Sequence, residues 1–199
     1  LVDETGHTID GDKVMAVCGA DLRRHGKLSG NAIVATVMSN LGLHEYCRKE
    51  GIELVCTAVG DRHVLEKMLE CGYAIGGEQS GHTIFREYAT TGDGELTAGK
   101  LLKLLAESGK KMSEIFPLFV PMYKKRVDTR FAGREEMLAA FELPAFKTAI
   151  AEGERKIEGK GRVLVRTSGT EPKIQVWVWG DDAALADKVN GEKSAVLAK

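Results

Sequence analysis

The chain has 199 residues, of which 43% are hydrophobic and 29% are charged. This composition is ordinary for globular proteins and excludes a disordered, collagen-like or disulfide-scaffold chain. The length suits one or two domains. The net charge of −1 argues against a nucleic-acid or membrane-surface partner, because such partners select a strong basic excess. The longest apolar runs are far shorter than the ~20 residues that a membrane-spanning helix needs.

Cysteine, histidine and acidic residues show no metal-binding or disulfide pattern. The four cysteines include no CxxC pair, and no Asp/Glu cluster has the tight spacing of a magnesium site. We therefore predict no metal site within this chain and a reducing, cytoplasmic location.

The first residues predict the end of a strand that enters a hairpin turn, because apolar Leu1-Val2 precedes Asp-Glu-Thr-Gly. There is no initiator Met, basic n-region or apolar h-region, so the segment does not have the pattern of a signal peptide. We expect the chain to be part of a longer protein.

Residues 11–118 alternate helices with short apolar strands. Asp10 is expected to cap a helix that ends near Gly26, and Ser113 is expected to cap one helical turn before Pro117. Further helices are predicted over 41–50, 61–71 and from Gly94 to Gly109, with strands over 31–36, 52–59 and 73–75. This alternation predicts an α/β fold in which helices flank a mostly parallel sheet.

Pro117 and Pro121 are two prolines within five residues and favour extended chain, so the predicted domain boundary lies between them. After it, the pattern predicts strands over 122–127, 162–166 and 173–179 and helices over 134–141, 145–152 and 181–199. This order is typical of a smaller α+β domain with a late hairpin.

The turn between the last two predicted strands contains Arg166, Thr167, Ser168, Gly169 and Thr170. Hydroxyls, backbone N–H groups and a forked guanidinium are suitable donors to a phosphate, and glycine permits close approach. The turn lacks the Lys and following helix of a Walker A loop. The same composition is also typical of an ordinary hairpin turn.

A second polar turn, residues 76–82, follows the predicted strand 73–75. Ligands of α/β proteins bind at the carboxyl ends of parallel strands. Here Glu78 and Ser80 can bond sugar hydroxyls, and His82 can donate to phosphate or exchange a proton. A Gly-rich surface loop is the structural alternative.

Two shorter motifs open predicted helices. Gly60-Asp61-Arg62 follows a strand, with Asp61 as the simplest helix cap and Arg62 as a surface residue unless a ligand reaches it. Residues 91–94 form a similar cap and turn.

Six stretches together resemble the α-D-phosphohexomutase superfamily. They follow the order of that superfamily and are 9–13 (IDGDK), 38–43 (MSNLGL), 59–68 (VGDRHVLEKM), 77–82 (GEQSGH), 90–94 (TTGDG) and 166–172 (RTSGTEP). Gln79, with the VGDR and TTGDG stretches, favours the members that act on glucosamine phosphates over the phosphomannomutase and phosphoglucomutase relatives. Gln175, Trp177 and Trp179 depart from the pattern, since relatives often have an Arg and smaller apolar residues in this strand.

The resemblance implies a fold of several domains. Residues 1–18 correspond to the end of the second domain, 19–118 to the third domain, a mixed sheet with flanking helices, and 119–199 to the smaller C-terminal domain. The phosphoserine loop and the loop that binds Mg²⁺ are then expected upstream of Leu1.

The resemblance also implies a reaction. A phosphoserine gives its phosphate to a sugar phosphate, which forms a hexosamine 1,6-bisphosphate, the intermediate and activator. The bisphosphate then returns its other phosphate to the serine. In this scheme Glu78, Ser80 and the Gly60–Arg62 segment bind the sugar, His82 acts at the reacting hydroxyl, and residues 166–170 hold the phosphate that is not transferred. A homodimer is compatible with this scheme. A sugar-phosphate-binding module without catalysis is the alternative.

Overall fold

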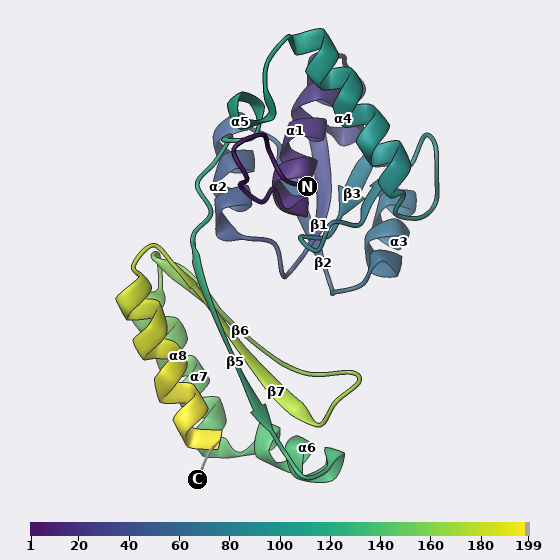
Figure 1. Ribbon diagram of the computed structural model, residues 1–199. Helices are drawn as coiled ribbons and strands as arrows, with labels where there is room; N and C mark the ends of the chain where they lie inside the picture. Colours follow the sequence, from purple (N-terminus) through teal and green to yellow (C-terminus); the bar gives the residue numbers. More distant parts are fainter. Residues whose placement is uncertain (198–199) are drawn as a thin grey trace. The chain divides into compact units, whose positions relative to one another are not determined.

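The structure, a computed structural model, describes residues 1–197 (Figure 1). The chain divides between Pro121 and Met122 into two compact units. Each unit has its own hydrophobic core.

The first unit contains a four-stranded mixed sheet in the order β2-β1-β3-β4. Its strands are β1 Ala32–Thr36, β2 Glu53–Thr57, β3 Ile75–Gly77 and β4 Thr83–Phe85. β2, β1 and β3 are parallel, as the alternating pattern predicts, and β4 pairs antiparallel with β3. The sequence did not identify β4, because three residues are too few to show a strand periodicity.

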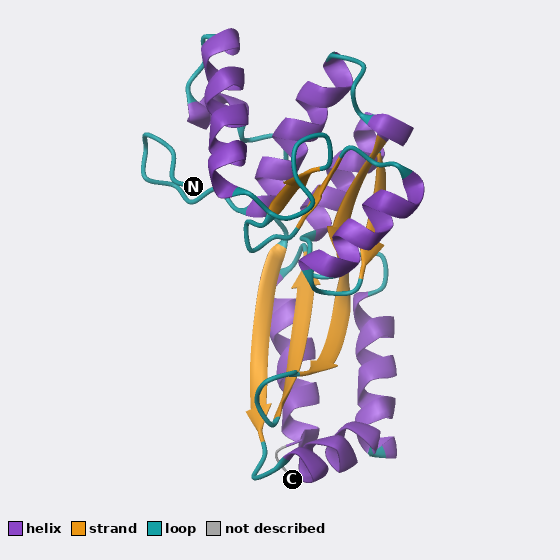
Figure 2. Cartoon of the chain, turned by 90° about the vertical axis from the view of Figure 1, so that its right-hand side faces the viewer, coloured by secondary structure: helices purple, strands orange, loops and turns teal. Residues whose placement is uncertain are grey.

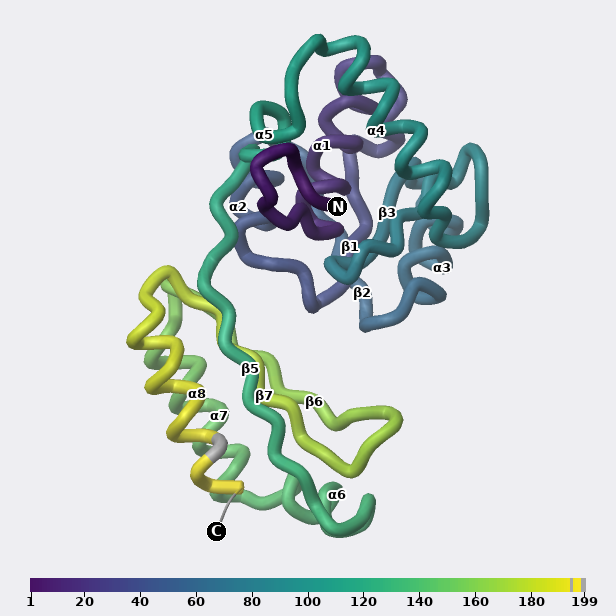
Figure 3. Tube along the Cα trace, viewed as in Figure 1, coloured from purple at the N-terminus to yellow at the C-terminus, as the bar shows by residue number. Residues whose placement is uncertain are grey.

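Helices cover both faces of this sheet, so the predicted α/β fold is confirmed. They are α1 Gly11–Arg24, α2 Leu41–Glu50, α3 Asp61–Cys71, α4 Gly94–Ser108 and the short α5 Met112–Ile115, with a 3-10 turn at Ser29–Asn31. Figure 3 follows the chain through this alternation.

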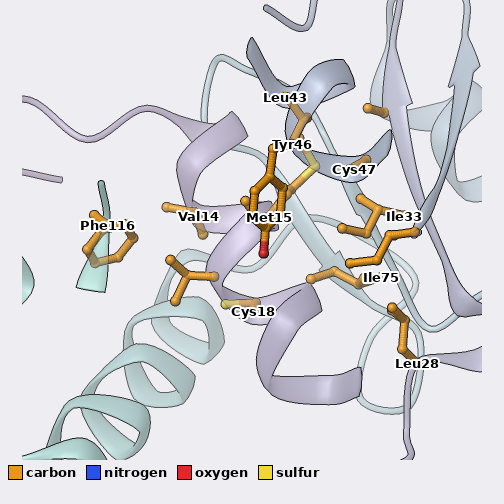
Figure 4. Close-up of a cluster of buried hydrophobic side chains, with 14 of the residues drawn as sticks. Val14, Met15, Cys18, Leu28, Ile33, Leu43, Tyr46, Cys47, Ile75 and Phe116 are labelled. Carbon is orange, nitrogen blue, oxygen red and sulfur yellow. The ribbon is translucent and has the colours of Figure 1, made fainter. Parts of the chain in front are cut away.

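Side chains of β1 alternate between the two faces, as they must in a strand. Ile33 packs with Met15 and Leu43 in the larger core (Figure 4). Val34 packs on the other face with residues of α3. All five residues of β1 are buried, and the first four are apolar, because helices cover both faces of the strand.

Two of the predicted helix caps are confirmed. Asp10 accepts a hydrogen bond from the Lys13 N–H at 3.1 Å, and Asp93 accepts one from the Leu96 N–H at 2.9 Å. Both carboxylates satisfy N–H groups that lack a partner within the helix.

Two other cap predictions are wrong. Gly60, with φ 126°, is the N-cap of α3, and Asp61 is its first helical residue. Lys111 is the N-cap of α5, and Ser113 lies inside that helix with its hydroxyl bonded to Glu4. The N-cap lies one residue before Asp61 and two residues before Ser113, and each of these polar side chains has another hydrogen-bond partner.

The N-terminal segment turns back on itself, since Val2 and Thr8 form an isolated antiparallel bridge. Within the turn, the Asp3 carboxylate accepts hydrogen bonds from the N–H groups of Thr5 and His7, both at 2.9 Å. This is the predicted hairpin.

The second unit is an antiparallel sheet of three strands, in the order β5-β7-β6, packed against helices. Its elements are β5 Tyr123–Arg130, α6 Arg134–Glu142, α7 Pro144–Ile157, β6 Gly161–Thr167, β7 Lys173–Gly180 and α8 Ala183–Leu197 (Figure 2). The predicted α+β order with a β6–β7 hairpin is confirmed. Residues 198 and 199 of the predicted final helix lie outside the described residues.

The two faces of this sheet differ. Ile174, Val176 and Val178 of β7 are buried in the core with residues of the helices. Gln175, Trp177 and Trp179 alternate with them and therefore lie on the other face.

Among residues 1–197, none of the helices has the length and apolar character required to cross a membrane.

Candidate sugar and phosphate sites

The loop between β3 and β4, residues 78–82, is a tight turn at the end of the sheet. The Glu78 N–H donates to the His82 carbonyl at 2.9 Å, and the Gly81 N–H donates to the Glu78 carbonyl at 3.0 Å. Gly81 has φ 115°, a conformation that other residues rarely adopt. We call residues 78–82 the sugar loop.

Glu78 is the centre of this loop. Its Oε1 accepts a hydrogen bond from the Gly60 N–H at 3.0 Å, and its Oε2 lies 3.6 Å from Nδ1 of His82. The Glu78 side chain is 14% exposed and that of His82 is 62% exposed. Ser80 is also exposed. The structure therefore brings Gly60 to Glu78, 18 residues later in the sequence, and places His82 beside the same carboxylate.

The side chains of Asp61 and Arg62 interact within their own helix. Arg62 donates to Glu66 at 2.8 Å, and this contact raises the pKa of the guanidinium. The Asp61 carboxylate accepts from the Arg62 N–H at 2.8 Å. In this structure the segment contributes to the sugar loop through the Gly60 backbone.

The turn that caps α4 lies against the sugar loop. A Cβ atom on Gly92 would be 3.2 Å from Cβ of His82, and the Asp93 N–H donates to the Thr83 carbonyl at 3.2 Å. The TTGDG stretch therefore supports the position of His82.

Sequence reasoning missed a buried polar cluster beneath the loop. Asp12, in the first turn of α1, is fully buried, and its Oδ2 accepts from the Asn40 N–H at 2.7 Å and from the Gln79 amide at 3.0 Å. The one available signal was that Asp12, Asn40 and Gln79 belong to three of the six recognised stretches.

Burial raises the pKa of Asp12 to about 6, and the hydrogen bonds from Asn40, Ser39 and Gln79 oppose this rise. The carboxyl group is consequently still mostly ionised at pH 7. An ionised carboxylate can only accept hydrogen bonds, which fixes the Gln79 NH₂ group toward it.

A solvent-open pocket of about 350 Å³ lies beside the sugar loop. Its lining includes Asp10, Gly11, Gln79, Ser80 and Gly81, together with residues of the N-terminal segment and of α4. Pockets of this size are in the range of small-molecule sites.

The second unit carries the other predicted site in the turn between β6 and β7. The Ser168 hydroxyl is the acceptor for the N–H groups of Thr170 and Glu171, at 3.4 and 3.3 Å, and the Ser168 N–H donates to the Lys173 carbonyl at 2.9 Å. Ser168 is 7% exposed, whereas Gly169 and Thr170 are exposed. We call residues 166–170 the clamp loop.

Acidic side chains next to the clamp loop are already paired. Lys173 contacts Glu171 at 2.5 Å and Asp128 at 3.2 Å, and Arg130 contacts Glu171 at 2.9 Å. Arg126 also binds Asp128, and this hydrogen bond, ahead of those from Lys173, lowers the pKa of Asp128 to about 2. These carboxylates therefore do not repel an anion as free charges would.

Arg166 differs from these basic residues. Its guanidinium has no ion pair with any of the described residues, and it is partly exposed beside Gln175, its neighbour in the β6–β7 register. Thr167 follows it at the end of β6. An unpaired guanidinium close in sequence to the exposed Gly169 and Thr170 is suited to binding an oxyanion.

Residues 1–197 contain no group of three or more His, Cys, Asp or Glu side chains that could hold a metal ion.

Known protein families match both units. The model "Phosphoglucomutase/phosphomannomutase, alpha/beta/alpha domain III" matches residues 10–123, and the C-terminal domain of the same family matches residues 125–193.

Individual relatives are phosphoglucosamine mutases. The enzyme of Caldicellulosiruptor saccharolyticus is 49% identical over 182 residues, which cover 92% of this chain and 40% of the relative. That of Desulforudis audaxviator is 45% identical over 196 residues, which cover 98% of this chain and 43% of the relative. The chain thus spans less than half the length of these two relatives.

Solved structures share the fold. An N-acetylphosphoglucosamine mutase of Aspergillus fumigatus gives a TM-score of 0.80 at 20% identity, covering 100% of this chain and 45% of that one. The same enzyme in complex with GlcNAc-6P and magnesium gives a TM-score of 0.77 at 20% identity, covering 99% of this chain and 49% of that one.

Proposed function

The chain belongs to the phosphoglucomutase/phosphomannomutase family, of which it contains domains III and IV. From this premise we propose that it supplies sugar binding and phosphate binding to a phosphoglucosamine mutase, which interconverts glucosamine 6-phosphate and glucosamine 1-phosphate. Relatives of this activity, at 45 to 50% identity, support the choice of substrate. Cytoplasmic location and service to amino-sugar metabolism are part of the same proposal.

The observation that carries the proposal is the contact of Glu78 with the Gly60 N–H, 3.0 Å long, next to His82 and the exposed Ser80. The carboxylate and the hydroxyl can both bond sugar hydroxyls, while the fixed backbone holds them in place. His82 lies 3.6 Å from the Glu78 carboxylate, and its exposed imidazole can reach a sugar bound at the loop. His82 is therefore the residue to which we assign proton donation or charge stabilisation at the reacting hydroxyl.

Arg166 and residues 167–170 are proposed to hold the phosphate group that is not transferred. Binding energy from this remote group can orient the reacting end of the sugar. The role also suits a substrate that reacts at either end, because glucosamine 6-phosphate and glucosamine 1-phosphate each carry one phosphate that the clamp loop can hold.

The transfer of phosphate is proposed to pass through a phosphoserine and a hexosamine 1,6-bisphosphate, with Mg²⁺ neutralising the charge of the transferred group. Residues 1–197 contain no cluster suitable for Mg²⁺. We therefore assign no step to a metal bound by this chain, and its residues bind and orient the sugar phosphate.

Calorimetric titration of the 199-residue chain tests the binding part. We expect glucosamine 6-phosphate to bind more tightly than the 6-phosphates of mannose and glucose. Ser80→Ala should weaken binding, whereas Ser29→Ala, at an exposed serine of the 3-10 turn, should not. Tighter binding of mannose 6-phosphate or glucose 6-phosphate would instead favour a phosphomannomutase or phosphoglucomutase, and equal affinity for all three would contradict the choice of substrate.

Turnover tests the catalytic part. With glucosamine 6-phosphate and Mg²⁺, the chain alone should form no glucosamine 1-phosphate, and detectable product would contradict the proposal. In a full-length protein with this sequence, His82→Ala should mainly lower kcat, by about 10²-fold or more, as expected for a group in proton transfer.

A further inference from the structure

We propose that Asp12 is a positioning residue for the sugar loop. It holds the side chain of Gln79, which is the residue between Glu78 and Ser80 in the sequence. The inference rests on the proposed function of that loop. Asp12 lies in α1, 67 residues from Gln79 in the sequence, and no substrate group needs to touch it.

Gln79 is fixed at two points. Its side-chain amide donates to Asp12 Oδ2 at 3.0 Å, and its backbone carbonyl accepts from the Gly11 N–H at 3.0 Å. Asp10 adds a longer contact, with Oδ2 at 3.4 Å from the same amide nitrogen. The start of α1 therefore holds both the main chain and the side chain of the middle of the sugar loop.

The fit between α1 and the loop is close. A Cβ atom on Gly11 would lie 2.1 Å from the Glu78 carbonyl oxygen and 2.9 Å from the Gly81 nitrogen. Real Cβ atoms do not approach backbone atoms so closely, so the residue at this position must be glycine for the loop to keep its path.

Asp12 also connects the loop to α2. The same Oδ2 atom accepts from the Asn40 N–H at 2.7 Å, and Asn40 is the N-cap of α2 through its own bond to the Gly42 N–H at 2.8 Å. One buried oxygen thus joins α1, the cap of α2 and the sugar loop. A fully buried carboxylate is an unfavourable choice for packing alone. A positioning role accounts for its presence.

A purely structural role for Asp12 would affect folding without specific coupling to Gln79. We therefore compare Asp12→Asn, Gln79→Met and the double variant in the 199-residue chain, with Asp21→Asn as the matched control. Asp21 is on the same helix, is partly exposed and pairs with Arg24. Gln79→Met removes the donor at a partly exposed site and leaves the Asn40 bond in place, so it should fold even if Asp12→Asn does not.

The first readout is the Kd for glucosamine 6-phosphate. We expect each single variant to raise Kd about five- to twentyfold, and the double variant to bind no more weakly than the weaker single variant. Asp21→Asn should stay within twofold of the wild type. Additive losses, or single variants within twofold of the wild type, would overturn the inference.

The second readout needs no ligand, and it separates failure of this inference from failure of the proposed function. Hydrogen exchange at the Gly11 and Gly81 amides reports on the loop itself. We expect at least tenfold faster exchange at these amides in Asp12→Asn and in Gln79→Met, with unchanged exchange in the strands. If the wild type fails to bind the sugar but these amides respond, only the proposed function is wrong. If they do not respond, Asp12 does not position the loop.

Discussion

Arg166 and Lys173 lie on the same face of the β5–β7–β6 sheet, but their charges have different surroundings. Lys173 is buried and pairs with Glu171 and Asp128, which raise the pKa of its ammonium group. Arg166 has no ion pair with the described residues, and it is partly exposed to solvent. Lys173 therefore holds the turn together, while Arg166 is available to an anion.

This difference predicts the effect of Arg166→Ala. A hydrogen bond to a charged group contributes about 1.5–3 kcal/mol. Its loss should therefore weaken binding of glucosamine 6-phosphate by about ten- to a hundredfold. Titration of the chain with the sugar phosphate, and with inorganic phosphate as a second probe, measures the change.

Arg155→Ala is the matched control for charge. Arg155 is exposed in the last turn of α7, a helix that contacts the opposite face of the sheet. It should bind like the wild type. Equal losses for both variants would mean that only the overall charge matters, and no loss for either would remove Arg166 from the clamp loop.

At the scale of elements, close contact between α1 and the sugar loop predicts an asymmetry between two glycines. Gly11→Ala places a Cβ 2.1 Å from a backbone oxygen, which cannot move as a flexible side chain can. Overpacking of this kind costs about 1–3 kcal/mol. We expect the free energy of unfolding, measured with urea, to fall by about 2 kcal/mol.

Gly99→Ala is the comparison. Gly99 lies inside α4, and a Cβ there would meet no atom within 4 Å. Alanine is a better helix former than glycine by about 0.5–1 kcal/mol, so this variant should be more stable than the wild type. The same sign for both variants would show that backbone entropy, and not the contact with Glu78, decides the result at position 11.

The local pattern of the sequence predicts elements better than it predicts how they are joined. The helix from Gly11 and the β6–β7 hairpin follow from periodicity, caps and turn residues, and the structure contains both. The start of α3 was misplaced because Asp61 has the residue type of a cap, whereas Gly60 has the backbone conformation.

The candidate site was predicted in part. Glu78, Ser80 and His82 are adjacent in the sequence, so their grouping required no knowledge of the fold. The contacts of Glu78 with Gly60 and of Gln79 with Asp12 join residues 18 and 67 positions apart. Such contacts depend on strand order and helix placement, which a single sequence does not specify.

At the scale of the whole molecule, the two units carry acidic groups with opposite pKa shifts, one partly exposed and one buried. The pKa of Asp128 in the second unit is lowered to about 2, chiefly by Arg126. The pKa of Asp12 in the first unit is raised to about 6, chiefly by burial. Stability should therefore depend on pH in opposite directions in the two units.

Tryptophan fluorescence isolates the second unit, because both tryptophans of the chain, Trp177 and Trp179, lie in β7. Because the pKa of Asp128 is lower in the folded state, its carboxylate stabilises the folded second unit at pH values above the ordinary pKa of 3.8. This contribution is lost as pH falls toward 2. Allowing for solvent screening, we expect a loss of about 1 kcal/mol in fluorescence-detected urea unfolding. Asp128→Asn should remove most of this pH dependence, and an unchanged slope would show that other carboxylates cause it.

Asp12 should change the stability of the first unit in a higher pH range, and in the opposite direction to the effect of Asp128 on the second unit. Because its folded pKa is above the ordinary value of 3.8, the folded state binds the proton more tightly, so the first unit gains stability as pH falls from 7 through 6 toward 4. A shift of this size corresponds to at most about 3 kcal/mol. Hydrogen exchange at the buried amides of β1, corrected for intrinsic rates, should give a higher opening free energy at pH 5 than at pH 7. Asp12→Asn should abolish the difference while leaving the fluorescence transition of the second unit unchanged. A wild-type opening free energy that is lower at pH 5 would mean that the bonds from Asn40 and Gln79 outweigh burial at this carboxylate.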